Sequence, residues 1–239
     1  MIKVELHSHP KGGSPCADGD SQLAVQKFID AGYGGVVCTT HYSKPYYENV
    51  FQGQTHKEKI DYFFKVYDDF VKIANEKGLK TFFGAEVRCV PTNTEYILVG
   101  FDRVFLYENP PLFNLSQQEL FEVAEKNGFF MYQSHPFRTA VTVGDPKYMH
   151  GAESFNGHYH HINNNDIAQK FCKENNLVGL VGTDYHHDDQ PLTTGIMLPK
   201  SIDTEKQLAD FLKKGEFSVV ADKDLYEKSL EKHLQRKNK

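Results

Sequence analysis

Histidines and acidic residues stand at the ends of five apolar runs of the sequence. They are His7 and His9 after residues 2–6, His41 after 34–40, Glu86 near the end of 81–87, His135 after 128–134, and Asp184 and His186 after 177–183. Neutral imidazoles and carboxylates suit zinc, manganese or iron as ligands. A carboxylate such as Glu86 can also bridge two ions. These side chains therefore predict a centre for divalent metal ions.

Two pairs within this set have a spacing of two residues. In a β-strand, residues i and i+2 project to the same face, so His7 should point the same way as His9, and Asp184 the same way as His186. A single histidine at a strand end is more often a hydrogen-bonding residue than a ligand. The full set favours metal binding, because without ions each buried titratable group would need its own partner.

The elements that must position these side chains alternate between strands and helices. Runs with a strand pattern occupy 2–6, 34–40, 81–87, 95–101, 128–134 and 177–183, and amphipathic helical patterns occupy 21–34, 55–78, 115–128, 163–176 and 204–215. Ser116 and Glu119 have the spacing of a capping box at the start of one helix. The alternation predicts an α/β fold with a mostly parallel sheet, as a closed or distorted barrel. In such folds the carboxyl ends of the strands form the active-site rim.

Length and composition indicate an ordinary globular protein. The chain has 239 residues, of which 39% are hydrophobic and 25% charged, and we expect one domain over 1–239 with helices over 200–239. No run approaches the ~20 apolar residues of a membrane span, and residues from Ile2 onward look like a strand rather than a signal peptide. We therefore predict a cytoplasmic protein without a membrane partner.

Charge and cysteine content bear on partners and cofactors. The formal net charge is −5, and no basic face is evident, so we expect no long nucleic acid as a partner. The four cysteines form no C-x-x-C pair, which argues against a structural zinc ribbon, and we interpret them as scattered reduced thiols.

A few further polar residues are candidates for substrate contacts. Arg138, three residues after His135, is the best candidate for an anion clamp, and Lys11, two residues after His9, is the second; the alternative for both is a surface ion pair. Glu153 and Asn156 end a short run and are candidates to support the ligands. The histidine-rich segment 157–165, which holds His158, His160 and His161, is either a polar surface loop or a lid that contacts substrate.

Five short motifs resemble those of the polymerase-and-histidinol-phosphatase (PHP) family of metal-dependent phosphoesterases. In the family's order they are ELHSH (5–9), VVCTTHYS (36–43), GAEV (84–87), QSHPFR (133–138) and VGTDYHH (181–187). The resemblance covers residues 2 to about 187. It implies a distorted (β/α)7 TIM-like barrel with up to three metal ions at the carboxyl ends of its strands.

The resemblance also implies how the ligands are shared. His7, His9, Glu86 and Asp184 would hold one ion; Glu86 and His135 would share a second; His41 and His186 would share a third. Three positions depart from the family pattern: Thr40 replaces an aspartate, only Asp18 or Asp20 offers a ligand in the loop after the first motif, and Glu95 or Tyr96 stands where a histidine is common. The second and third positions would therefore each lack one usual ligand.

The function that follows is hydrolysis of a phosphate ester, most simply of a small phosphomonoester, with one to three zinc, manganese or iron ions. Such ions lower the pKa of a bound water from 15.7 to about 7. Arg138 and Lys11 would stabilise the phosphoryl oxygens, and His41 or His186 would protonate the leaving oxygen if free of metal. The alternatives are an amidohydrolase-type C–N hydrolase, a nuclease or phosphodiesterase acting on short strands, and a non-catalytic metal-binding domain.

Overall fold

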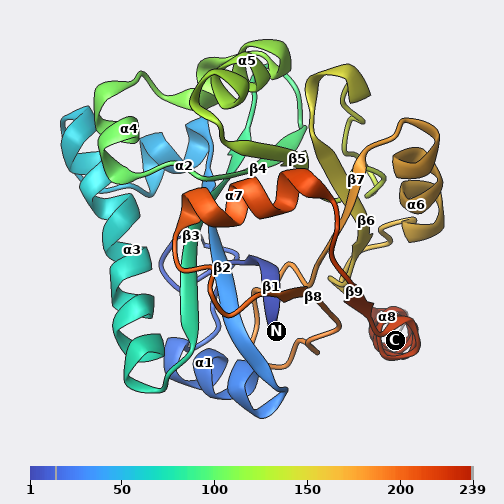
Figure 1. Ribbon diagram of the computed structural model, residues 1–239. Helices are drawn as coiled ribbons and strands as arrows, with labels where there is room; N and C mark the ends of the chain where they lie inside the picture. Colours follow the sequence, from blue (N-terminus) through green and yellow to red (C-terminus); the bar gives the residue numbers. More distant parts are fainter. Residues whose placement is uncertain (14, 238–239) are drawn as a thin grey trace.

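A barrel-shaped sheet with helices around it forms the described part of the chain, which in this computed structural model is residues 1–13 and 15–237 (Figure 1). The strands are β1 (Ile2–Ser8), β2 (Tyr33–Tyr42), β3 (Lys80–Arg88), β4 (Glu95–Val99), β5 (Phe130–Gln133), β6 (Gly151–Asn156), β7 (Val178–Gly182), β8 (Thr194–Leu198) and β9 (Val219–Ala221). The helices are α1 (Ser21–Asp30), α2 (Lys44–Asn49), α3 (His56–Glu76), α4 (Arg103–Glu108), α5 (Gln117–Asn127), α6 (Asn165–Glu174), α7 (Glu205–Lys214) and α8 (Lys223–Lys237), with short 3₁₀ turns at Leu112–Asn114 and Pro146–Tyr148.

The sheet runs in the order β7-β6-β5-β4-β3-β2-β1-β8-β9. A bridge between Ser8 and Tyr185 brings the end of β1 to the chain just beyond β7 and nearly closes the barrel. The predicted distorted α/β barrel is thus confirmed, but the strand count differs from seven. The short strand β9 lies between α7 and α8, the two helices of the segment 200–239 in which helices were predicted.

Two strands run against the predicted parallel direction. β4 pairs antiparallel with both β3 and β5, and β8 pairs antiparallel with β1. The chain between β3 and β4 spans only residues 89–94, whereas a parallel pair needs a crossover of about a dozen residues or more. A short connection therefore forces β4 to return beside β3 in the opposite direction.

Helix α7 closes the end of the barrel opposite the carboxyl ends of β1 and β3. Its Leu208 and Leu212 are fully buried against barrel residues such as Val4 and Phe82, and Figure 1 shows the helix lying across the sheet. The helix begins at a capping box of Thr204 and Gln207. The predicted capping box of Ser116 at the start of α5 is also present. One end of the barrel is therefore filled with apolar side chains, and the polar residues gather at the other.

No helix in residues 1–13 and 15–237 combines the length and the apolar character that a membrane crossing requires.

Candidate metal centre

The strand ends place the predicted ligands around one rim of the barrel. In the parallel pair β2–β3, His41 lies opposite Glu86. His7 lies near the end of β1, and Asp184 lies just beyond β7. Glu95 reaches the same rim by another route: it is the first residue of β4, and because β4 is antiparallel its start lies where the neighbouring strands end.

Side chains of four residues form the first group of the site. His7 Nε2 lies 2.9 Å from His9 Nε2, 3.4 Å from Glu86 Oε1 and 3.4 Å from Asp184 Oδ1. His9 Nε2 lies 3.3 Å from Asp184 Oδ1 and 3.6 Å from Glu86 Oε2. Ligands at 2.0–2.1 Å from a tetrahedral ion lie about 3.3–3.4 Å from one another. The printed contacts of these four side chains, at 2.9 to 3.6 Å, are close to that spacing, so the side chains that the motifs assign to the first ion lie near enough to share one.

A second group surrounds the other side of Glu86. His135 Nε2 lies 3.1 Å from Glu86 Oε1 and 3.6 Å from Glu95 Oε2. Arg88 binds the other oxygen, Oε1, of Glu95 through Nε at 2.9 Å and Nη2 at 2.5 Å. Between the two residues that the sequence left open, Glu95 is therefore the one at the site. Tyr96 packs instead in the apolar cluster on the outer face of the sheet.

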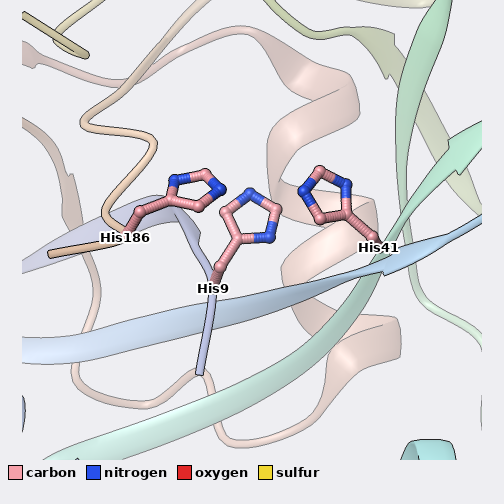
Figure 2. A group of neighbouring side chains, drawn as sticks. All are labelled: His9, His41 and His186. Carbon is pink, nitrogen blue, oxygen red and sulfur yellow. The ribbon is translucent and has the colours of Figure 1, made fainter. Parts of the chain in front are cut away.

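A third group consists of His9, His41 and His186, whose imidazoles turn toward one another with His9 between the other two (Figure 2). The ring centroid of His9 lies 4.3 Å from that of His41 and 4.1 Å from that of His186. Cys16 is the loop residue that joins this group, with Sγ 3.5 Å from His41 Nε2. The prediction of Asp18 or Asp20 at this place is not met: Asp18 binds His187, and Asp20 caps α1.

Carboxylates and amides outside these groups hold the histidines in place, as predicted for Glu153 and Asn156. His7 Nδ1 donates to Glu153 Oε1 at 2.8 Å, which fixes the tautomer and leaves the Nε2 lone pair for an ion. Glu153 Oε2 accepts from the backbone N–H of His135 and from the Asn156 amide, both at 2.8 Å. Gly182 permits this approach, because a Cβ there would lie 2.1 Å from Glu153 Oε1.

Electrostatics favour cations in this cluster. Burial would raise the pKa values of Glu86 and Asp184, but neighbouring cationic groups outweigh it and hold both well below the usual range. Burial would lower the pKa of His7, yet the carboxylates of Asp184, Glu153 and Glu86 raise it. For His9, burial and the neighbouring histidines together lower the pKa. The buried carboxylates thus stay ionised and draw positive charge to the site.

Unpartnered atoms and backbone strain both fit bound ions. Within residues 1–13 and 15–237, the buried atoms His9 Nδ1 and His135 Nδ1 have no hydrogen-bond partner, which is costly in a protein interior unless something else satisfies them. His135 (φ 30°) and Asp184 (φ 54°) have left-handed backbone conformations. Such strain persists at sites where function requires it. The residues present therefore fit a centre of divalent ions.

A cavity of about 530 Å³ opens above the cluster. Arg138 and Arg88 line it, whereas Lys11 is exposed and is not among its lining residues. The structure thus brings one of the two predicted anion clamps to the site and adds Arg88, the last residue of β3, which the sequence analysis did not single out.

The histidine-rich loop after β6 also reaches this cavity. His158, His160 and His161 line it together with His187. His158 is buried, and burial lowers its pKa well below the usual value. The loop therefore lies at the cavity, as the alternative of a substrate contact requires.

The guanidinium of Arg138 donates hydrogen bonds to residues at the edge of the histidine and carboxylate cluster. Its Nε donates to Asn163 Oδ1 at 2.9 Å, and its Nη2 donates to Asn156 Oδ1 at 2.9 Å and to Asp184 Oδ2 at 2.5 Å. A guanidinium carries five donors, and the two on Nη1 are not among these contacts. Arg138 therefore orients Asp184 and retains donors for a ligand in the cavity.

Comparisons with known proteins support the fold. No family model matches the sequence, and no curated protein matches it. Among solved structures, PsfC from Pseudomonas syringae PB-5123 superposes with a TM-score of 0.66 at 16% identity, over 100% of this chain and 99% of the other. A two-domain protein from Bacteroides vulgatus, described as containing a predicted PHP-like metal-dependent phosphoesterase, superposes with a TM-score of 0.58 at 18% identity, over 92% of this chain and 64% of that one.

A third similar structure corrects one prediction. Endonuclease Q, in complex with a 27-mer duplex substrate with an abasic lesion at the active site, superposes with a TM-score of 0.58 at 11% identity, over 92% of this chain and 58% of that one. The fold therefore occurs in a protein that takes a long duplex. The exclusion of long nucleic acid, which rested on net charge and the lack of a basic face, is wrong, because overall charge does not describe the field of a site that holds metal ions.

Proposed function

We propose that this chain, which has the fold of the PHP-like metal-dependent phosphoesterases, hydrolyses phosphate esters with the help of divalent ions. The observation that carries the proposal is the close approach of His7, His9, Glu86 and Asp184, in which the two Nε2 atoms lie 2.9 Å apart and 3.3 to 3.6 Å from carboxylate oxygens. A second position would use Glu86, Glu95 and His135. Zinc, manganese and iron all suit imidazole and carboxylate ligands.

The residues around the cavity divide the work as follows. When bound, the ions supply the Lewis acidity that turns water into a nucleophile at neutral pH. Arg138 donates from Nη1 to a phosphoryl oxygen and stabilises the charge that develops there. We assign His41 to ion binding rather than to proton transfer, because its Nδ1 lies 2.8 Å from Glu86 Oε2 and its Nε2 faces Cys16. His186 has the same assignment, since its Nδ1 donates to the carbonyl oxygen of Asp184.

The cavity limits the part of the substrate that reacts. Its volume of about 530 Å³ is typical of sites for small ligands. We propose that the reacting phosphate enters it as part of a small phosphorylated molecule or as a group on a longer chain such as a nucleic acid. The histidine-rich loop and Arg88 would then contact the remainder of the substrate.

A substrate screen tests the proposal. Metal-free protein is reconstituted with zinc, manganese or iron(II) and assayed on phosphomonoesters, phosphodiesters and DNA duplexes with and without an abasic site, beside amide and cyclic amide substrates. We expect ion-dependent cleavage of at least one phosphate ester. Turnover of amides alone, or stoichiometric ion binding with no turnover of any phosphate ester, would contradict the proposal.

Replacing Arg138 with lysine tests the anion clamp. The charge remains, but the planar fork that holds Asp184 and a phosphoryl oxygen together is lost. One charge-assisted hydrogen bond contributes about 1.5–3 kcal/mol, so we expect kcat/KM to fall roughly 10–100-fold and inhibition by inorganic phosphate to weaken in parallel. The matched control is Arg103→Lys, since Arg103 pairs with Asp68 on the surface. Unchanged phosphate inhibition in the Arg138 variant would show that Arg138 does not bind the phosphate group.

A further inference from the structure

Cys16 occupies a place in the metal centre that the sequence motifs do not assign to it. It lies in the loop between β1 and α1 and lines the main cavity. Its Sγ lies 3.5 Å from His41 Nε2 and 3.6 Å from the hydroxyl oxygen of Tyr46, and it also interacts with the imidazole of His186. The other three cysteines, Cys38, Cys89 and Cys172, are buried elsewhere and are not among the residues lining this cavity.

The two histidines beside Cys16 are fixed through their other ring nitrogens. His186 Nδ1 donates to the carbonyl oxygen of Asp184 at 2.9 Å. His41 Nδ1 lies 2.8 Å from Glu86 Oε2. Both contacts leave Nε2 as the free ligand atom, as a hydrogen bond to the remote nitrogen does for histidines that bind metals.

The path of the loop holds the thiol in this position. The backbone N–H groups of Asp18 and Gly19 both donate to the carbonyl oxygen of His186, at 3.2 and 3.1 Å. The side chain of Asp18 binds His187 at 2.7 Å. The segment that carries Cys16 is thus tied to the segment that carries His186, so thiol and imidazole are brought together by the backbone and not by one flexible side chain.

We propose that Cys16, His41 and His186 form a mixed sulfur and nitrogen position for a thiophilic divalent ion, with zinc preferred over manganese or magnesium. This inference rests on the proposed metal centre and concerns its third position. One thiolate and two imidazoles leave a coordination place open, as in catalytic zinc sites with three protein ligands. Soft thiolate ligands select zinc, whereas the first two positions offer only nitrogen and oxygen.

With this ligand set the three positions of the metal centre differ in their metal preference. Two positions accept manganese, iron or zinc, and the third favours zinc. The buried imidazole of His9 separates the first position from the third, with ring centroids 4.3 Å from His41 and 4.1 Å from His186. The Nδ1 atom of His9 has no hydrogen-bond partner within residues 1–13 and 15–237.

Cobalt(II) substitution tests the proposal without relying on activity. Metal-free full-length protein is titrated with cobalt(II) and its absorption spectrum is recorded. A cobalt–thiolate bond gives an intense charge-transfer band in the near ultraviolet that nitrogen and oxygen ligands do not give. We expect the band in the wild type and its loss in Cys16→Ala. Because loss of even an outer-shell partner costs roughly 10–100-fold in metal affinity, zinc affinity at this position should fall at least as much in that variant.

Two further variants serve as controls. Cys172→Ser, in α6, changes a thiol that only donates to the carbonyl oxygen of Ala152, and it should keep the band. Cys16→His should keep zinc binding and lose the band, because the third ligand becomes nitrogen. Bound zinc should also slow alkylation of Cys16, measured by mass spectrometry.

The outcomes separate this inference from the proposed function. A wild-type protein that binds cobalt and cleaves phosphate esters without the thiolate band, or a band that survives Cys16→Ala, would overturn the role of Cys16 and leave the phosphoesterase proposal intact. A band that requires Cys16 in a protein with no phosphoesterase activity would support the inference and count against the function.

Discussion

The Glu86→Gln variant is expected to lose nearly all ion-dependent hydrolysis, with kcat lower by about 10²–10³-fold or more, the loss that follows removal of one electrostatic stabiliser. Glu86 is fully buried and lies within 3.6 Å of ring nitrogens from His7, His9, His41 and His135. It therefore contacts histidines of all three groups. A neutral amide keeps its size but removes the charge that ions at the first two positions share.

The measurement combines steady-state kinetics with the metal content of each purified variant. Glu5→Gln is the matched control, because Glu5 is also fully buried but binds backbone N–H groups, that of His7 among them, and the Thr183 and Thr194 hydroxyls rather than the imidazoles. Its carboxyl has a pKa raised to about 7 by burial, so a neutral amide suits the site. We expect the control to retain both ions and activity. Equal loss in both variants would point to damage to the barrel instead.

Zinc or manganese should raise the melting temperature strongly. Ligand at 1,000 times its dissociation constant stabilises the native state by about 4.1 kcal/mol, which for a chain of this size corresponds to roughly 8–16 °C. The physical reason is that the ions satisfy buried carboxylates and imidazoles that otherwise face one another. Differential scanning calorimetry of chelator-treated protein with and without added ion measures the shift. Calcium, which binds oxygen ligands, should have little effect.

Two histidine variants show where the stabilisation arises. His9→Ala removes a ligand of the first group and should abolish most of the shift. His56→Ala removes a histidine that instead contacts the Tyr47 hydroxyl and the Leu106 carbonyl oxygen, each at 2.8 Å, and should keep it even if the starting melting temperature changes. A large shift that persists in His9→Ala would place the ions elsewhere.

Local spacing explains the part of the site that the sequence predicts well. His7 and His9, or Asp184 and His186, are two residues apart, and each pair follows an apolar run. Strand periodicity and the shared edge of parallel strands then bring these side chains to one rim. That reasoning needs only short-range pattern and the sense of the sheet, and the structure places all seven predicted ligands in one buried cluster.

The positions of Glu95, which the sequence left open against Tyr96, and of Cys16, which the sequence missed, depend on tertiary structure. Glu95 begins a strand, and it reaches the rim only because β4 is antiparallel. Cys16 lies in a loop whose path is set by bonds to the carbonyl oxygen of His186, far away in the sequence. A test for C-x-x-C pairs could not find it, since its partners are histidines. For both Glu95 and Cys16, the sequence offered one indication: each lies in a stretch where the usual ligand of the PHP family is replaced.

The central claim is that His7, His9, Glu86 and Asp184 hold a divalent ion. Anomalous X-ray diffraction from crystals grown with zinc, recorded on both sides of the zinc absorption edge, tests it most directly. We predict an anomalous peak at about 2.0–2.2 Å from His7 Nε2, His9 Nε2 and the two carboxylates. Zinc-loaded crystals in which this cluster is well ordered and carries no such peak would contradict the account.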